Sequence, residues 1–132
     1  MKSTFDKKKS ILVVDDDADI CNTLVDIFNA EGYVTDVAYN AGAAIEKMQT
    51  SSGFDILLTD IRMENMDGLQ LVRKVAQINP KIIIFMMTAY PRDSRINEAY
   101  TSGVVKVFEK PFEVNDMLEI FKNEIAKRDK KN

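Results

Sequence analysis

Acidic side chains gather at two places in the sequence, each just after a short apolar run. Three consecutive aspartates, 15 to 17, follow one run directly, and Asp60 comes two residues after another. Carboxylates that met at the ends of neighbouring strands would repel by about 4 kcal/mol per close pair at an effective dielectric constant of about 20, unless a cation lay among them. An all-oxygen ligand set favours a hard cation, and an open site with one or two carboxylates is typical of Mg²⁺. The sequence therefore predicts Mg²⁺ at these acids, with Asp17 as a helix N-cap.

Asp60 has the surroundings that a phosphoryl acceptor requires. A carboxylate can accept a phosphoryl group as an aspartyl phosphate, and the protein then contributes mainly positioning and neutralisation of charge. Thr88 and Lys110 follow two further apolar runs, so strands ending there would place a hydroxyl donor and a positive charge beside Asp60. Taken singly, Thr88 equally fits an ordinary strand end and Lys110 an ordinary surface lysine. Their joint placement favours a site in which Asp60 accepts the phosphoryl group.

The runs that carry these residues are apolar without alternation, which is typical of parallel strands buried on both faces. The predicted strands are 11–14, 34–38, 56–58, 82–87 and 104–108. Segments with helical spacing of apolar residues lie between the strands and after the last one. Strict alternation of strand and helix predicts an α/β fold, with a parallel sheet between two layers of helices.

Turn residues mark where the predicted helices end. Gly32, Gly53 and Gly103 follow the first, second and fourth predicted helical segments. Each stands just after a helix end, where a positive φ is favourable. Pro80 pushes the preceding Asn79 out of the helical region, which ends the third helical segment. Neither a repeat nor a linker divides the chain, so a single domain is predicted.

Four motifs in the sequence resemble those of response-regulator receiver domains from two-component signalling. They are ILVVDDD, FDILLTDIRMENMDGL, MMTAY and FEKPF, and the resemblance covers residues 10–127. It implies the flavodoxin-like (CheY-like) α/β/α sandwich, with five parallel strands in the order 2-1-3-4-5. It also divides the chain into a basic N-terminal extension at 1–9, a receiver domain at 10–127 and a C-terminal tail at 128–132.

The resemblance implies a role for each residue at the strand ends. It implies that Mg²⁺ is held by Asp15, Asp16, Asp60 and the backbone carbonyl of Arg62. Asp60 would be the phosphorylated aspartate, Thr88 the switch residue and Lys110 the residue that holds the phosphoryl group. A cis peptide bond before Pro111 would aim Lys110 inward. The phosphoryl donor would be a sensor histidine kinase or a histidine phosphotransfer protein.

Two positions depart from the usual receiver pattern. Glu64 stands where a proline usually follows the methionine, which predicts a looser loop after Asp60. Val107 stands where receivers usually carry Tyr or Phe, so an aromatic switch is not expected. We expect the signal to pass instead through displacement of the segment from Thr88 to Tyr100.

Two large residues bear on how long the acceptor stays phosphorylated. Arg62 lies two residues after Asp60, and Tyr90 lies two residues after Thr88. This pair resembles the one in sporulation-type relay proteins that lack an output domain. If both side chains restrict water, the phosphorylated form hydrolyses slowly, whereas two side chains that simply lie on the surface would have no such effect. The sequence leaves open whether the chain stands alone or is the front of a larger regulator, and also its oligomeric state.

Composition excludes several other classes of protein. The 132 residues include one cysteine and no histidine, which excludes internal disulfides, Cys/His zinc sites and Ser/His or Cys/His catalytic pairs. No apolar run approaches the ~18 residues that span a bilayer, and no signal-peptide pattern is present, so we expect a cytoplasmic protein without membrane contact. The lysines near both ends fit solvated tails, and direct nucleic-acid binding is not expected.

Three alternative functions fit the sequence less well. In a haloacid-dehalogenase-like phosphatase Asp15 would be the nucleophile, but Ala18 stands where that class has Thr or Val, and the chain is short. A receiver-like interaction module would be expected to lack members of the acid set. A nucleotide or flavin binder would need a Gly- or Ser-rich phosphate loop. We therefore expect a switch that catalyses its own phosphorylation and hydrolysis, and no turnover of free metabolites.

Overall fold

The computed structural model describes residues 8–51, 53–63 and 67–130, so Glu64 and most of the predicted extension lie outside the described residues. The strands are β1 (Ser10–Val14), β2 (Val34–Ala38), β3 (Ile56–Asp60), β4 (Ile83–Thr88) and β5 (Lys106–Glu109). The helices are α1 (Ala18–Ala30), α2 (Ala41–Thr50), α3 (Gly68–Ile78), α4 (Arg95–Thr101) and α5 (Val114–Lys130). Within the described ranges, none of these helices has the length and apolar character needed to cross a bilayer.

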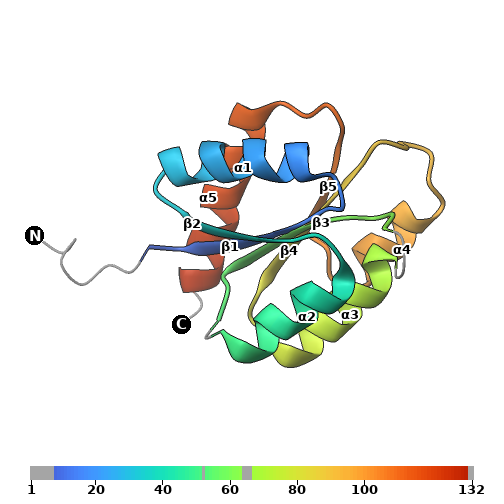
Figure 1. Ribbon diagram of the computed structural model, residues 1–132, viewed down its shortest axis with the longest axis horizontal. Helices are drawn as coiled ribbons and strands as arrows, with labels where there is room; N and C mark the ends of the chain where they lie inside the picture. Colours follow the sequence, from blue (N-terminus) through green and yellow to red (C-terminus); the bar gives the residue numbers. More distant parts are fainter. Residues whose placement is uncertain (1–7, 52, 64–66, 131–132) are drawn as a thin grey trace, which may run out of the picture.

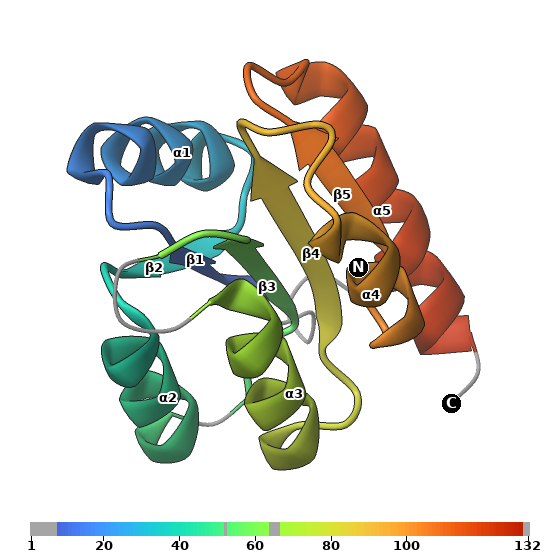
Figure 2. The ribbon, with the colours of Figure 1, turned by 90° about the vertical axis from the view of Figure 1, so that its right-hand side faces the viewer.

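The five strands form one parallel sheet in the order β2-β1-β3-β4-β5. Helices α1 and α5 cover one face of the sheet, and α2, α3 and α4 cover the other (Figures 1 and 2). The three-layer α/β/α sandwich and the strand order 2-1-3-4-5 are therefore confirmed.

Each strand contributes to two hydrophobic cores, because successive side chains point to opposite faces of the sheet. Val13 packs on the side of α1 and α5, whereas its neighbour Val14 packs on the side of α2 and α3. Aromatic rings fill the centre of the first core, where the ring centroid of Phe121 lies 5.5 Å from that of Phe28 and 4.6 Å from that of Phe85. Burial on both faces explains why the central strands β1, β3 and β4 are apolar without alternation.

The ends of the helices follow the local signals in the sequence. Asp17 is the N-cap of α1, and its Oδ1 accepts two backbone N–H groups of the first turn at 3.0 and 3.3 Å. Positive φ angles of 95°, 65° and 103° occur at Gly32, Gly53 and Gly103. Helix α3 ends before Asn79, as the following proline predicts.

The register of the sheet brings four strand ends to one edge, which we call the carboxyl edge: the ends of β1, β3, β4 and β5. Asp60 lies opposite Met87, and Thr88 lies opposite Glu109. Lys110 follows Glu109 directly, so residues far apart in the sequence meet at this edge. In parallel sheets this is where ligands bind, which makes the carboxyl edge the place to look for chemistry.

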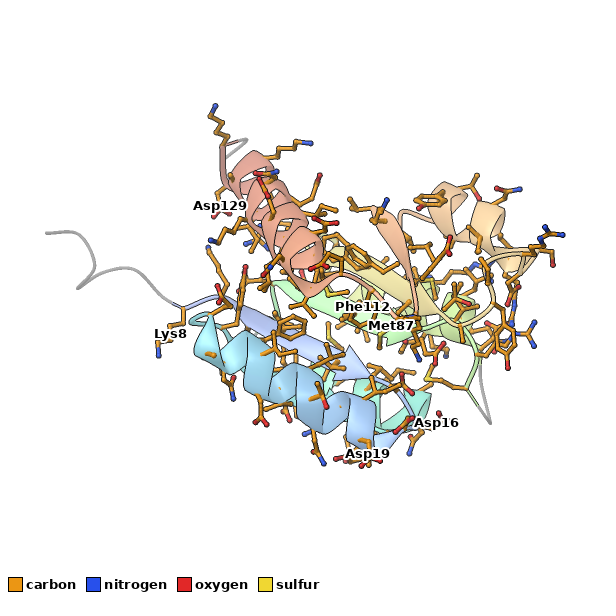
Figure 3. All side chains as sticks on the ribbon, turned by 90° about the horizontal axis from the view of Figure 1, so that it is seen from above. Lys8, Asp16, Asp19, Met87, Phe112 and Asp129 are labelled. Atoms are coloured by element: carbon orange, nitrogen blue, oxygen red, sulfur yellow. The ribbon has the colours of Figure 1, made fainter. Side chains whose placement is uncertain are left out.

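The opposite edge of the sheet is tied to the end of α5. Arg128 Nη2 donates a hydrogen bond to Asp55 Oδ1 at 2.8 Å, and Asp55 directly precedes β3. Helix α5 thus includes residues 128–130, which had been predicted as tail. Figure 3 shows Asp129 near this end of the molecule and Asp16 at the carboxyl edge.

Candidate functional site

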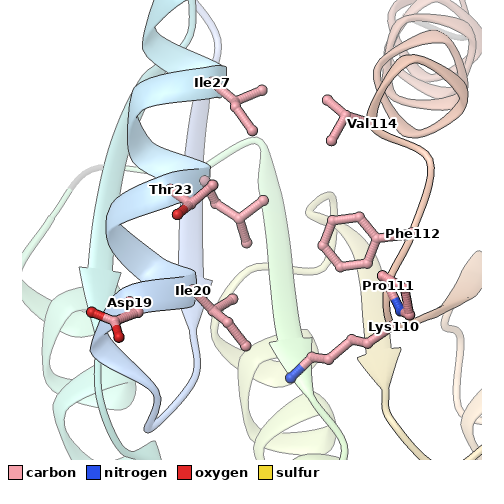
Figure 4. Close-up of a pocket in the computed structure, with 9 residues that line it drawn as sticks. Asp19, Ile20, Thr23, Ile27, Lys110, Pro111, Phe112 and Val114 are labelled. Carbon is pink, nitrogen blue, oxygen red and sulfur yellow. The ribbon is translucent and has the colours of Figure 1, made fainter.

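Lys110 joins the two acidic groups at the carboxyl edge. Its Nζ donates hydrogen bonds to Asp15 Oδ2 at 2.8 Å and to Asp60 Oδ2 at 2.9 Å. The side chains of Lys110, Asp15 and Asp60 are 16%, 1% and 14% exposed, so these ion pairs are largely shielded from water. The peptide bond between Lys110 and Pro111 is cis, as expected. Figure 4 shows Lys110 extending from the loop after β5 toward the strand ends.

Burial and charge oppose each other at this cluster. Burial raises the pKa of Asp60 above its ordinary value, although the hydrogen bond and the charge of Lys110 act in the other direction. Burial alone would lower the pKa of Lys110, but its hydrogen bonds to Asp15 and Asp60 outweigh that effect and raise it. Lys110 therefore carries its charge at neutral pH. Two carboxylates share this one ammonium group, so the cluster keeps an excess of negative charge.

The donor chemistry of the cluster fits a hard divalent cation. Asp15 and Asp60 offer carboxylate oxygens only, and the exposed Asp16 adds a further acid at the same edge. In the part of the chain that the structure describes, no three acidic, cysteine or histidine side chains are gathered at metal-ligand spacing. A bound ion would therefore complete its coordination with water, backbone or phosphate oxygens, which is the way Mg²⁺ is usually held.

Thr88 ties the end of β4 to the loop that follows. Its side chain is buried, with the residue 1% exposed. The hydroxyl accepts a hydrogen bond from the backbone N–H of Tyr90 at 2.9 Å and donates to the carbonyl oxygen of Tyr90 at 3.3 Å. The carbonyl oxygen of Thr88 accepts a hydrogen bond from the backbone N–H of Lys110 at 2.7 Å. Both contacts of the Thr88 hydroxyl with Tyr90 therefore depend on the orientation of this one side chain.

Asp93 connects the loop after β3 with the loop after β4. Its Oδ2 accepts hydrogen bonds from Arg62 Nε at 3.0 Å and from Arg95 Nη2 at 2.9 Å. The Asp93 side chain is only 3% exposed. The hydrogen bonds from Arg95, together with the single one from Arg62, hold the pKa of Asp93 well below its ordinary value. Asp93 is therefore an ionised carboxylate shared by two arginines.

Arg62 and Tyr90, the two predicted modulators, lie against each other. The guanidinium carbon of Arg62 is 4.3 Å from the centroid of the Tyr90 ring. Both are about half exposed, at 53% for the Arg62 side chain and 54% for Tyr90. The backbone N–H of Arg62 donates to Asp60 Oδ1 at 3.2 Å, so this stack is attached directly to the predicted acceptor.

Val107, the position without an aromatic side chain, makes a different contact. It is buried, and its backbone N–H donates to the hydroxyl of Tyr100 at 3.0 Å. Because β5 is an edge strand of the sheet, this bond satisfies a donor that no neighbouring strand pairs. It also joins α4 to β5 within the region where the switch is expected.

Gly68 and Asp93 were not predicted as parts of the site. A Cβ atom at Gly68 would lie 2.3 Å from the carbonyl oxygen of Asp60, so a side chain would prevent α3 from beginning this close to the acceptor. A glycine directly after the N-cap Asp67 was a usable local signal, since glycine is unfavourable within a helix. The contact of Asp93 with Arg62 spans 31 residues and has no local signature.

An apolar groove lies beside the site, between α1 and the loop after β5 (Figure 4). Its volume is about 450 Å³, and Lys110 and Pro111 form one part of its wall. The remaining lining residues are mostly apolar: Asp19, Ile20, Thr23, Leu24, Ile27, Phe112 and Val114.

Several known proteins resemble this chain. The family model of the response regulator receiver domain matches residues 11–122. Sporulation initiation phosphotransferase F of Bacillus subtilis (strain 168) is 32% identical over 114 residues, which are 86% of this chain and 91% of that protein. Transcriptional regulatory protein ZraR of Klebsiella oxytoca is 37% identical over 107 residues, and the chain spans 24% of its length. A crystal structure of a CheY-like receiver domain protein from Methanospirillum hungatei JF-1 matches 96% of this chain with a TM-score of 0.90 and 28% identity.

Proposed function

The chain belongs to the response regulator receiver domain family, and from this premise we propose that it is a Mg²⁺-dependent phosphorylation switch whose acceptor is Asp60. Phosphoryl acceptance is the general function of the family. The observation that carries the assignment to Asp60 is the shared ammonium group of Lys110, which bonds Asp60 on one side and Asp15 on the other. Such a fixed positive charge beside a carboxylate is what phosphoryl transfer to that carboxylate requires.

In the proposed reaction a carboxylate oxygen of Asp60 attacks phosphorus. The bond between phosphorus and the donor breaks, and the donor atom keeps the electron pair. Lys110 holds Asp60 in place and compensates negative charge on the transferred group. Mg²⁺, when bound by Asp15, Asp16, Asp60 and the backbone carbonyl of Arg62, would supply further compensation of charge on the phosphoryl oxygens.

The proposed donor is a sensor histidine kinase or a histidine phosphotransfer protein. Transfer to Asp60 requires that the donor's side chain reach the carboxyl edge, and the apolar groove beside Lys110 offers a surface for such a protein next to the acceptor. The chain would catalyse its own phosphorylation and the later hydrolysis, without turnover of free metabolites. Its output would be contact with another protein, and no direct contact with nucleic acid or membrane is proposed.

The proposed switch runs through the loop after β4. A phosphoryl group on Asp60 adds negative charge and hydrogen-bond acceptors, which favours rotation of the Thr88 hydroxyl toward it. That rotation would break the two bonds between Thr88 and the backbone of Tyr90, so the start of the loop would rearrange while the bond from Arg62 to Asp93 still holds the later part of the loop. The bond from Val107 to Tyr100 would pass the movement of α4 on to β5.

We also propose that the phosphorylated form is long-lived. Arg62 and Tyr90 stack over the loops next to Asp60, where they would restrict the approach of water. The name of the relative from Bacillus subtilis describes a phosphotransferase of sporulation initiation, and this chain aligns with 91% of it. A protein that transfers its phosphoryl group to another protein must keep that group until the two proteins meet. We therefore propose that the chain acts in a phosphorelay.

The test is incubation with acetyl phosphate and Mg²⁺, followed by intact-mass measurement. We expect the wild type to gain the mass of one phosphoryl group and Asp60→Ala to gain none. Asp129→Ala, which removes an aspartate at the opposite end of the molecule, serves as a matched control and should be labelled like the wild type. Labelling of Asp60→Ala at the wild-type rate would refute the assignment.

The phosphatase alternative makes a different prediction about the labelled residue. Asp15 would then carry the phosphoryl group, and reduction with borohydride followed by peptide mapping distinguishes the two sites. We expect the modified peptide to contain Asp60. A modified Asp15 would favour the alternative, although that side chain is 1% exposed and already bonded to Lys110.

A further inference from the structure

We propose that Asp93 is a positioning residue that holds Arg62 over Tyr90 and thereby lengthens the life of the phosphoryl group on Asp60. This inference rests on the proposed function of Asp60 as the acceptor. It assigns a role to a carboxylate that the proposed function does not otherwise use, since that function rests on the acid cluster together with Thr88 and Lys110.

Asp93 is itself fixed at the start of α4. Its Oδ1 accepts from the backbone N–H of Arg95 at 2.9 Å and from Arg95 Nε at 3.1 Å, and its Oδ2 accepts from Arg95 Nη2 at 2.9 Å. Its backbone N–H donates to the carbonyl of Tyr90 at 3.0 Å, and its carbonyl accepts from Ile96 at 3.1 Å. Arg95 Nη1 also lies 3.7 Å from Asp67 Oδ2, next to the start of α3. The carboxylate of Asp93 is therefore a rigid anchor between two loops.

Arg62 is the residue that this anchor holds. Its backbone is bonded to the acceptor Asp60, while its Nε donates to Asp93 Oδ2 at 3.0 Å across to the other loop. The stack of its guanidinium on the Tyr90 ring is weak by itself when half exposed to water. A long arginine side chain also loses rotamer freedom when it is held in one place. The buried charge of Asp93 is thus what keeps Arg62 across the gap between the loops.

The position of Arg62 matters for hydrolysis. In that step a water oxygen bonds to phosphorus, the bond from phosphorus to the Asp60 oxygen breaks, and the carboxylate is regenerated with release of the water proton. Attack in line with the breaking bond needs open space on the outer side of the phosphoryl group. A wall of Arg62 and Tyr90 restricts that space, and the wall loses its support when Asp93 loses its charge.

The experiment is a double-mutant cycle on the rate at which the phosphoryl group is lost. Wild type, Asp93→Asn, Arg62→Asn and the double variant are labelled with acetyl phosphate and Mg²⁺, the donor is removed, and intact mass is followed over time. We expect both single variants to lose the group about three- to tenfold faster than the wild type, and the double variant to match Arg62→Asn. That pattern is expected only if Asp93 acts through Arg62.

Glu98→Gln is the matched control. Glu98 of α4 pairs with Arg73 of α3, so this contact joins the same two parts of the chain by a carboxylate and an arginine, but through the helices and with both side chains about half exposed. We expect its phosphoryl lifetime to equal that of the wild type. A faster loss in this variant would show that any weakened link between the two helices suffices, and would overturn the specific role of Asp93.

A spectroscopic measurement separates positioning from a general loss of structure. In the unphosphorylated protein we expect the Nε–H signal of Arg62 in a ¹⁵N NMR spectrum to be protected from exchange, to lose that protection in Asp93→Asn, and to keep it in Asp60→Ala. An unprotected signal in the wild type would contradict the contact on which the inference depends.

The outcomes distinguish the two proposals. If the wild type incorporates no phosphoryl group, the proposed function fails and this inference with it. If incorporation is normal but Asp93→Asn decays at the wild-type rate or more slowly, only the inference is overturned. An equal acceleration by Asp93→Asn in the presence and absence of Arg62 would likewise overturn it, because the effect would then not pass through Arg62.

Discussion

At the residue scale, the ammonium group of Lys110 reduces the repulsion between two carboxylates at the carboxyl edge. Lys110 bonds Asp15 and Asp60 at almost equal distances, and it is the nearest compensating charge for both. Because a single positive charge cannot balance two carboxylates, the pair of Asp15 and Asp60 keeps an excess of negative charge, which favours a cation there.

Asp93 should make the stability of the protein depend on pH on the acid side. Its pKa lies below the ordinary value of about 3.9 that an unfolded chain shows. In the acid range the folded state therefore binds fewer protons than the unfolded state, so the free energy of unfolding falls as the pH falls. The stabilisation is complete above the unfolded pKa and is lost as the pH drops toward the folded one.

This pH dependence can be measured by urea unfolding of the wild type and Asp93→Asn. We expect the variant to be less stable than the wild type at about pH 7, and the difference to begin to shrink at about pH 3, where the unfolded chain takes up a proton at this carboxyl while the native carboxylate is still ionised. A difference that stays constant over this range would show that the charge of Asp93 does not contribute to the free energy of unfolding.

At the element scale, the start of α3 sets the position of Asp60, the proposed acceptor. Helix α3 begins at Gly68, where an added Cβ atom would lie 2.3 Å from the carbonyl oxygen of Asp60 and 2.6 Å from Met86 Cε. The methionine end is flexible and can move, whereas the backbone of β3 cannot. Any side chain at this position must therefore displace either α3 or the end of β3.

Gly68→Ala is expected to destabilise the fold by about 1–3 kcal/mol through this overpacking and to slow phosphoryl acceptance by shifting Asp60. Gly42→Ala is the matched control, because Gly42 lies within α2 and its added Cβ would only touch Asn40 Oδ1 at 3.4 Å. That change should stabilise the protein by about 0.5–1 kcal/mol. Urea unfolding and acetyl phosphate labelling measure both effects, and an equal response of the two variants would contradict the steric argument.

At the scale of the whole molecule, the carboxyl edge of the sheet differs from the opposite edge, where the strands begin. The carboxyl edge gathers the acid cluster and the loops after β3 and β4, whereas the other edge is tied by Arg128 to Asp55 and by Lys9 to Asp129. Ion pairs therefore join elements at both ends of the sheet, and those at the carboxyl edge surround the candidate site.

Mg²⁺ should stabilise the folded protein as a whole, because the acids that would hold it meet only after folding. An ion present at about 100 times its dissociation constant adds about 2.7 kcal/mol to the free energy of unfolding. We expect thermal unfolding of the wild type to shift upward in Mg²⁺ and to return after addition of EDTA. Asp15→Asn should lose most of this shift, and Asp129→Asn should keep it. Equal shifts in all three proteins would indicate non-specific binding.

Local patterns in the sequence determined most of the elements. Runs without alternation gave the strands because both faces of the sheet are covered, and glycines with positive φ marked the turns. Boundaries were less certain: β5 begins at Lys106 although Val104 was predicted to start it, since an apolar run continues into the loop that enters the sheet. The end of α5 was predicted too early because the charged residues 128–130 look like a tail, whereas Arg128 in fact bonds to Asp55.

The sequence by itself determined which candidate residues meet at one edge of the sheet, because Asp15, Asp60, Thr88 and Lys110 each stand at the end of a recognisable strand. Strand ends in a parallel sheet converge whatever the details of packing, so their meeting followed from the order of elements. Only the tertiary structure decided which partner each side chain takes: Lys110 shared by two acids, the Thr88 hydroxyl bonded to Tyr90, and Arg62 drawn to Asp93. Such pairings depend on the distance between loops remote in sequence, and no local pattern encodes that distance.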